Sequence, residues 1–178
     1  MTYQAVIDFW FNELDSAQWF AKSDALDGII SQRFAALHAQ AVQGDLAEWR
    51  LADQGVLAEI ILLDQFSRNM YRDTAGAFAY DGQALFLAQD AVRRGVHQRL
   101  SDAHSMFLLM PFMHSESILV HETASFLFHE TEDDNFIQFE KQHAAIIKQF
   151  GRYPHRNACL GRESSPEELQ FLQEHVGF

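Results

Sequence analysis

Three polar segments of the sequence carry side chains that could bind or transform a ligand. In the first, "LLDQFSRNMYRD", Asp64, Arg68 and Arg72 are spaced i, i+4 and i+8 on the face that carries Leu57 and Ile61. A guanidinium beside an apolar stripe must be paired or must face a cavity. Asp64 and Arg68 have the spacing of an internal pair, whereas Arg72 has no helical partner. A structural ion pair and a binding site are both open interpretations.

The second segment, "MPFMHSESILVHE", places His114 and His121 seven residues apart, on one helix face. This spacing is not a recognised metal-ligand pattern, and no third ligand accompanies it. A neighbouring serine could serve as the nucleophile of a Ser-His-Glu triad, but the sequence lacks the nucleophile-elbow motif that such catalysis often uses. The remaining interpretations are a polar pocket that uses His114 and Glu116, or simply the polar start of a helix after Pro111.

The third segment, "FGRYPHRNACLGR", holds three arginines, one histidine and no acidic residue, in a chain of net charge -12. Its arginines suit bidentate recognition of a carboxylate or phosphate. The chain has ten arginines and three lysines, which fits such a role. The alternative is helix capping together with salt bridges to acidic neighbours. Cys159 lies four residues from His155, but this spacing in a loop fixes no catalytic geometry.

Length and composition predict a single domain over residues 1–178. With 48% hydrophobic and 13% aromatic residues, the chain can bury a sizeable core. Its acidic balance disfavours nucleic acid and anionic membranes as partners. No apolar run is long enough to span a membrane, and the N-terminus lacks the basic region of a signal peptide. A single cysteine excludes an internal disulfide, so we expect a cytoplasmic protein.

Hydrophobic periodicity is helical along almost the whole chain, and no hairpin-turn signal separates alternating strands. Gly44, Gly95 and Gly151 are predicted to end helices, and Asp81 to cap the start of one. "GVLAEIILLDQFSRNMY" is apolar on nearly all sides in its first half, as a buried helix is. Pro111 ends or kinks a helix, and "SSPEE" contains a capping box from Ser165 to Glu168.

The segments "VIDFWF", "ILLDQFSRNMYRDTAGAFAYD", "MPFMHSES" and "FGRYPHRNACLGRESSPEE" resemble the signature of a bacterial family, domain of unknown function 924. The resemblance extends from Val6 to about Leu172. It implies an all-α fold of stacked antiparallel helix hairpins, similar to tetratricopeptide repeats, with about seven or eight helices. The resemblance implies no established activity, substrate or cofactor. Two positions depart from the family pattern, since Cys159 replaces an aliphatic residue and His121 replaces a glutamine.

The family's polar signature, carried onto this sequence, falls on the same three segments. We therefore expect Arg68, Arg72, His114, Arg152 and Arg156 to converge in space. The first hypothesis is a binding module that holds an acidic peptide or small anion. The second is an enzyme with His114 or His155 as general acid/base, and the third is a purely structural network. No metal or cofactor is expected. The candidate ligand-binding residues are Arg68, Asn69, Arg72, His114, Glu116, Arg152, His155, Arg156 and Asn157.

Overall fold

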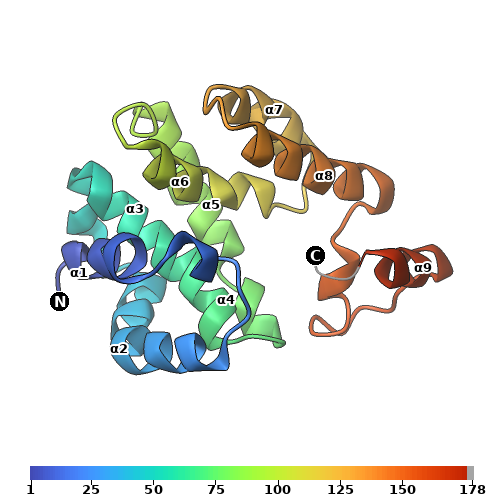
Figure 1. The fold of residues 1–178 in the computed structure, drawn as a ribbon, viewed down its shortest axis with the longest axis horizontal. Coiled ribbons are helices and arrows are strands. Elements are labelled where there is room, and N and C mark those ends of the chain that lie inside the picture. The colour runs from blue at the N-terminus through green and yellow to red at the C-terminus, as the bar shows by residue number, and fades with distance from the viewer. Residues whose placement is uncertain (176–178) are drawn as a thin grey trace. The chain divides into compact units, whose positions relative to one another are not determined.

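The computed structural model describes residues 1–175, and no β-strand occurs in this range. The prediction of an all-α fold is therefore confirmed (Figure 1). None of the helices described is long and apolar enough to cross a membrane. The α-helices are α1 (Tyr3–Asp8), α2 (Asp24–Gln43), α3 (Asp53–Ile61), α4 (Ser67–Met70), α5 (Asp81–Arg93), α6 (Asp102–Met113), α7 (Ile118–His129), α8 (Asp134–Phe150) and α9 (Pro166–Glu174).

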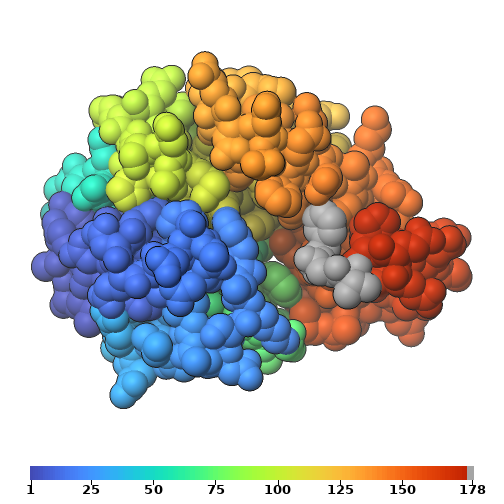
Figure 2. Space-filling model, in the orientation of Figure 1, coloured from blue at the N-terminus to red at the C-terminus, as the bar shows by residue number. Residues whose placement is uncertain are grey.

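The chain divides into two compact units, each with its own packing. Unit 1 comprises residues 1–72 and 76–111, and unit 2 comprises residues 73–75 and the chain from residue 112 onward. Figure 2 colours their surfaces by position in the chain. The first polar segment lies in unit 1 up to Arg72, whereas the residues of interest in the second and third segments lie in unit 2.

The core of unit 1 is built from aromatic rings. Phe34 lies with its ring centroid 5.0 Å from that of Phe9 and 5.0 Å from that of Phe66. Trp10 packs between Phe66 and Phe107, at 5.6 and 5.4 Å. These rings are almost fully buried, so they supply much of the apolar area that stabilises the unit.

The helix through the first polar segment is buried as predicted but is not regular. Between α3 and α4, residues Leu62–Phe66 form a π-helical turn, and α4 ends at Met70 with Tyr71 as its cap residue. Arg72 therefore lies beyond the helix. The predicted i, i+8 placement of Arg72 is wrong, because the helix ends before it, while the Asp64–Arg68 pair is confirmed at 3.0 Å.

Unit 2 is centred on a hairpin in which α7 packs against α8 (Figure 1). The Phe128 and Phe136 rings lie 5.0 Å apart between these two helices. Further along α8, Ile146 and Ile147 are buried together with Tyr153, which follows the helix. The segment after α8 includes a short 3-10 turn, Pro154–Arg156, and leads to α9.

Most of the helix ends lie where the sequence predicts them. Gly44 and Gly151 follow α2 and α8 with left-handed φ values of 81° and 70°, a conformation that glycine adopts without steric cost. The Ser165–Glu168 capping box is present at α9. Asp81 is not an N-cap, because it is the first residue of α5 and its carboxylate binds Arg68 instead. Pro111 lies inside α6, which continues to Met113.

A glycine in the first turn of α3 gives a test of this packing. A Cβ added at Gly55 would lie 2.0 Å from the carbonyl oxygen of Trp49, a backbone atom that cannot move freely. We expect Gly55→Ala to lower the free energy of unfolding by about 1–3 kcal/mol through overpacking. Chemical denaturation measures the change.

The matched control is Gly28→Ala, in the interior of α2, where a Cβ meets nothing within 4 Å. Alanine there should raise the free energy of unfolding by about 0.5–1 kcal/mol, because it favours the helix and restricts the unfolded chain. Equal effects of the two substitutions would contradict the close approach of Trp49 to Gly55.

Candidate polar site in unit 2 and its counterpart in unit 1

Arg68 in unit 1 joins two helices through carboxylates. Its two terminal nitrogens lie 2.9 and 3.0 Å from the carboxylate oxygens of Asp81, at the start of α5. The same guanidinium contacts the buried Asp64, which precedes it by one helical turn. A bidentate contact of this kind fixes the angle as well as the distance between the partners. Arg68 therefore ties α4 to α5.

Arg72 and Asn69 share a carboxylate on α2. The Arg72 Nε and Nη2 atoms lie 2.6 and 2.7 Å from the two Asp27 oxygens, and Asn69 Nδ2 donates at 2.8 Å. Burial raises the pKa of Asp27, but the hydrogen bonds from Arg72 and Asn69 outweigh it and hold the pKa below its usual range. Sequence reasoning missed Asp27 because it lies more than 40 residues from both partners.

Glu116 is the centre of the polar contacts in unit 2. Its carboxylate accepts hydrogen bonds from Arg162 Nη1 and Nη2, at 2.7 and 2.9 Å, and from the backbone N–H of Tyr153 at 2.8 Å. Burial raises the pKa of Glu116, but Arg162, this N–H and the nearby charge of Arg156 together lower it. Asn157 accepts a further hydrogen bond from Arg162 Nε at 2.9 Å. The second and third polar segments therefore meet at Glu116.

Arg152 pairs with α9. Its Nε and Nη2 atoms lie 2.7 and 2.8 Å from the Glu168 carboxylate oxygens. The Arg152 hydrogen bond is the main reason that the pKa of Glu168 falls to about 2. Glu168 also accepts from the Ser165 N–H, so one side chain closes the capping box and holds Arg152. This double role was not visible in the sequence, where the capping box alone explained Glu168.

Several basic residues lie near Tyr153, and we call the group the Tyr153 cluster. Its members are His121, His143, His155 and Arg156, together with His114, whose backbone accepts from Arg156. The Arg156 guanidinium lies over the Tyr153 ring, 4.5 Å from its centroid, and donates to the His114 carbonyl oxygen at 3.0 Å. The rings of His143 and His155 lie 5.7 and 5.5 Å from the Tyr153 ring. Arg156 is buried, so its desolvation is offset by these fixed contacts.

His121 and Glu140 form a buried pair within the hairpin. His121 Nδ1 lies 2.6 Å from Glu140 Oε1, and Nε2 lies 2.9 Å from the carbonyl oxygen of Ser115. Because a carbonyl oxygen only accepts, the Ser115 contact is a hydrogen bond that His121 Nε2 donates. The contact with Glu140 joins α7 to α8 inside unit 2.

His143 is a histidine of the cluster whose pKa lies far from its usual value. Its Nδ1 donates to the Phe139 carbonyl oxygen at 2.7 Å. Burial is the largest cause that lowers the pKa of His143 to about 4, and His114, His121 and His155 lower it further through like charge. His143 is therefore neutral at pH 7, with Nδ1–H as its hydrogen-bond donor.

The sequence-predicted residues are thus divided between the units. Unit 1 contains Arg68, Asn69 and Arg72, and unit 2 contains His114, Glu116, Arg152, His155, Arg156 and Asn157. Within unit 2, Glu116, Asn157 and the His114 backbone do meet the arginines of the third segment. Convergence of all three segments stays a prediction.

Cys159 lies in the segment after α8, and its thiol has a backbone partner. The Cys159 thiol donates to the Arg156 carbonyl oxygen at 3.2 Å. In residues 1–175, no three His, Cys, Asp or Glu side chains are grouped so that they could hold a metal ion. Sequence reasoning missed Glu140, His143 and Tyr153; the aromatic residue inside "GRYPHR" was the available signal for Tyr153.

Removal of the Glu116 carboxylate should destabilise the protein strongly. Glu116→Ala would leave the Tyr153 N–H and the partly buried Arg162 without their acceptor, at a cost of about 2–4 kcal/mol in the free energy of unfolding. The control is Glu13→Ala, which breaks the exposed pair with Arg33 and should cost less than about 1 kcal/mol. Similar losses for both variants, measured by denaturant titration, would contradict a central role of Glu116.

His143 should make the stability of the protein depend on pH. Its folded pKa of about 4 lies below the unfolded value of 6.5, so the unfolded state binds the extra proton between these values. The stabilisation by neutral His143 is complete above the unfolded pKa and is lost as pH falls toward 4. The expected loss is on the order of 1–3 kcal/mol.

Unfolding free energies at pH 7.0, 6.0 and 5.0, on the order of one pH unit apart, test this expectation. His143→Gln should flatten the profile, whereas the control His129→Gln, on the exposed end of α7, should not. An unchanged slope in His143→Gln would assign the acid lability to other groups.

Comparison with known proteins places the chain in a family. A solved structure of a protein of unknown function, ATU0120 from Agrobacterium tumefaciens, is 36% identical, with a TM-score of 0.92 over 97% of both chains. No curated protein matches the chain significantly. The model of the family described as bacterial protein of unknown function (DUF924) matches residues 6–175. The chain therefore belongs to the DUF924 family.

Proposed function

We propose that this protein is a helical binding module that holds an anionic group, a small anion or an acidic peptide side chain, at the Tyr153 cluster. The observation that carries the proposal is the buried Arg156 guanidinium, which lies over the Tyr153 ring, while the His143 and His155 rings pack near the same tyrosine. A guanidinium with a fixed orientation offers its donors to a carboxylate or phosphate at a low entropic cost.

The carboxylates nearest to the cluster support this assignment. Glu116 already accepts from Arg162 and Tyr153, and Glu140 already contacts His121 at 2.6 Å. The imidazole of His155, whose ring lies 5.5 Å from the Tyr153 ring, supplies a further polar group. An incoming anion would therefore meet Arg156 and imidazole groups beside carboxylates that already contact Arg162 and His121.

The other arginines are assigned a structural role in this proposal. Arg68, Arg72, Arg152 and Arg162 each contact a carboxylate through two nitrogens inside their own unit. Such pairs order helices and loops, and removal of one member would strand the other. Arg156 donates to the His114 carbonyl oxygen and lies over the Tyr153 ring, 4.5 Å from its centroid.

Binding of inorganic phosphate and of a short poly-glutamate peptide tests the proposal. Isothermal titration at constant ionic strength should give saturable binding of at least one probe. Arg156→Lys keeps the charge but loses the planar fork, and we expect binding to weaken by about tenfold or more. Phosphate binding alone would identify a small anion, and binding of the peptide alone would identify an acidic partner.

The control is Arg99→Lys, whose guanidinium is exposed and pairs with Asp53; it should leave binding unchanged. His155→Gln is a second variant for the case in which Arg156→Lys does not fold. The proposal is wrong if neither probe binds saturably, or if both cluster variants bind as tightly as the natural protein.

A further inference from the structure

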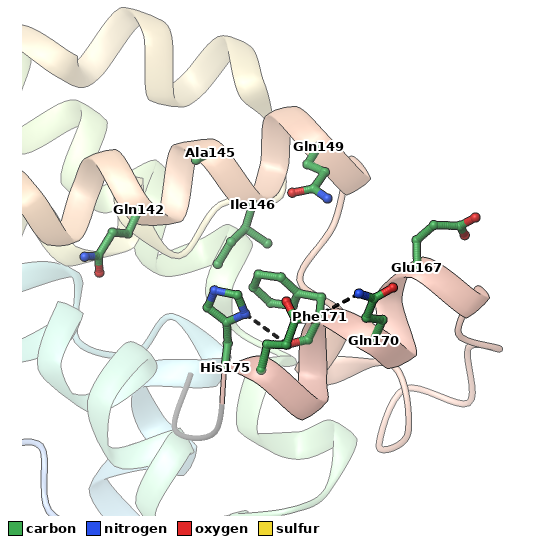
Figure 3. Close-up of a pocket in the computed structure, with 9 residues that line it drawn as sticks. Gln142, Ala145, Ile146, Gln149, Glu167, Gln170, Phe171 and His175 are labelled. Atoms are coloured by element: carbon green, nitrogen blue, oxygen red, sulfur yellow. Dashed lines mark hydrogen bonds between the residues drawn. The ribbon is translucent and has the colours of Figure 1, made fainter.

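A groove in unit 2 lies between α8 and α9, and its lining repeats at helical intervals on both sides. Figure 3 shows α8 contributing at i, i+3, i+4 and i+7, and α9 contributing with the same period. The groove has a volume of about 620 Å³. Its lining residues are Gln142, Ala145, Ile146 and Gln149 from α8, and Glu167, Gln170, Phe171, Glu174 and His175 from α9 and its end.

The floor of the groove is apolar and its edges are polar. Ile146 is buried and Phe171 half-buried, and the Phe171 ring packs on Phe150 at 5.2 Å and stacks on His175 at 4.2 Å. Ala145, with a small and exposed side chain, lines the groove on the α8 side. An apolar floor with polar side chains on both sides suits one face of an amphipathic helix.

The edges carry negative charge. Glu167 and Glu174 are exposed on α9, and none of the described residues that line the groove is Lys or Arg. A hydrogen bond from the Ser165 hydroxyl is the main cause that keeps the pKa of Glu167 below its usual range, so this carboxylate is ionised at neutral pH. Gln142, Gln149 and Gln170 add amide groups that donate and accept. The outer surface of α9 is visible in Figure 2.

We propose that this groove binds a basic amphipathic helix of a partner protein, with apolar residues toward Phe171 and Ala145 and Lys or Arg toward Glu167 and Glu174. Because the lining carries negative charge, we expect a positively charged partner. The lining side chains of both walls repeat at helical intervals, so a helical partner can match them. The lining of α9 covers about two helical turns, so the contact is short and the complex transient. The inference is independent of the anion proposed above, because it uses other side chains.

Two synthetic peptides of about 15 residues test the groove. Both carry the same Leu and Ala stripe at i, i+3, i+4 and i+7, and the flanking positions are Lys in one peptide and Glu in the other. Fluorescence anisotropy at low salt should show binding of the Lys peptide and none of the Glu peptide. Salt should weaken the binding, because the charges at the edges are exposed.

Variants of the protein locate the binding. Glu167→Gln combined with Glu174→Gln should weaken binding of the Lys peptide by about three- to tenfold. Ala145→Gln, an exposed and helix-compatible change, should weaken it by obstructing the floor. The matched control is Glu48→Gln combined with Glu122→Gln, two exposed acidic residues elsewhere that change the net charge equally.

Three results would overturn the proposal. The first is equal binding of the two peptides, and the second is an equal loss of affinity in the groove variants and in the control. The third is a concentration-dependent dimer, seen in sedimentation, that Ala145→Gln dissociates, since this would assign the groove to a second copy of the chain.

Discussion

The carboxylate of Glu116 is the contact on which the arrangement of unit 2 depends. It lies just before α7, yet its partners, Tyr153 and Arg162, lie at the two ends of the arginine-rich segment. One side chain therefore fixes both ends of a loop that has little regular structure of its own. The position of Tyr153 follows from this contact, and with it the positions of the rings and the guanidinium that pack on Tyr153.

Arginine–carboxylate pairs recur because the chain places strongly polar groups next to apolar cores. Arg50 donates to both carboxylate oxygens of Glu59, which is fully buried in α3. Its Nε and Nη2 atoms lie 2.7 and 2.6 Å from these oxygens. Such a carboxylate is costly to bury unless a partner satisfies both oxygens, and the planar fork of arginine does this with one residue. The excess of arginine over lysine in an acidic chain is explained by this need for geometry rather than by a need for positive charge.

Local features of the sequence predicted local structure well. The all-α fold, the helix ends at Gly44 and Gly151 and the Ser165–Glu168 box depend on residues within a few positions of one another. Ion-pair partners such as Asp27 and Arg72 lie tens of residues apart, and no spacing rule connects them. The π-helical turn at Leu62–Phe66 was equally invisible, because its apolar residues satisfy a regular helical period. The polar segments were found from composition, but their partners required coordinates.

The two sites proposed for unit 2 would bind ligands of opposite charge, and the two kinds of binding would depend on different interactions. The groove edges are exposed carboxylates on a chain of net charge -12, so a basic helix is attracted from a distance of about a Debye length. An anion is repelled over the same range, and its recognition must come from hydrogen bonds at short range, where the orientation of Arg156 is fixed by Tyr153 and the His114 carbonyl. Long-range attraction governs how fast a partner arrives, whereas fixed short-range donors govern how long it stays. An acidic protein can therefore hold an anion only where burial and orientation compensate for its overall field, and in unit 2 the Tyr153 cluster combines both.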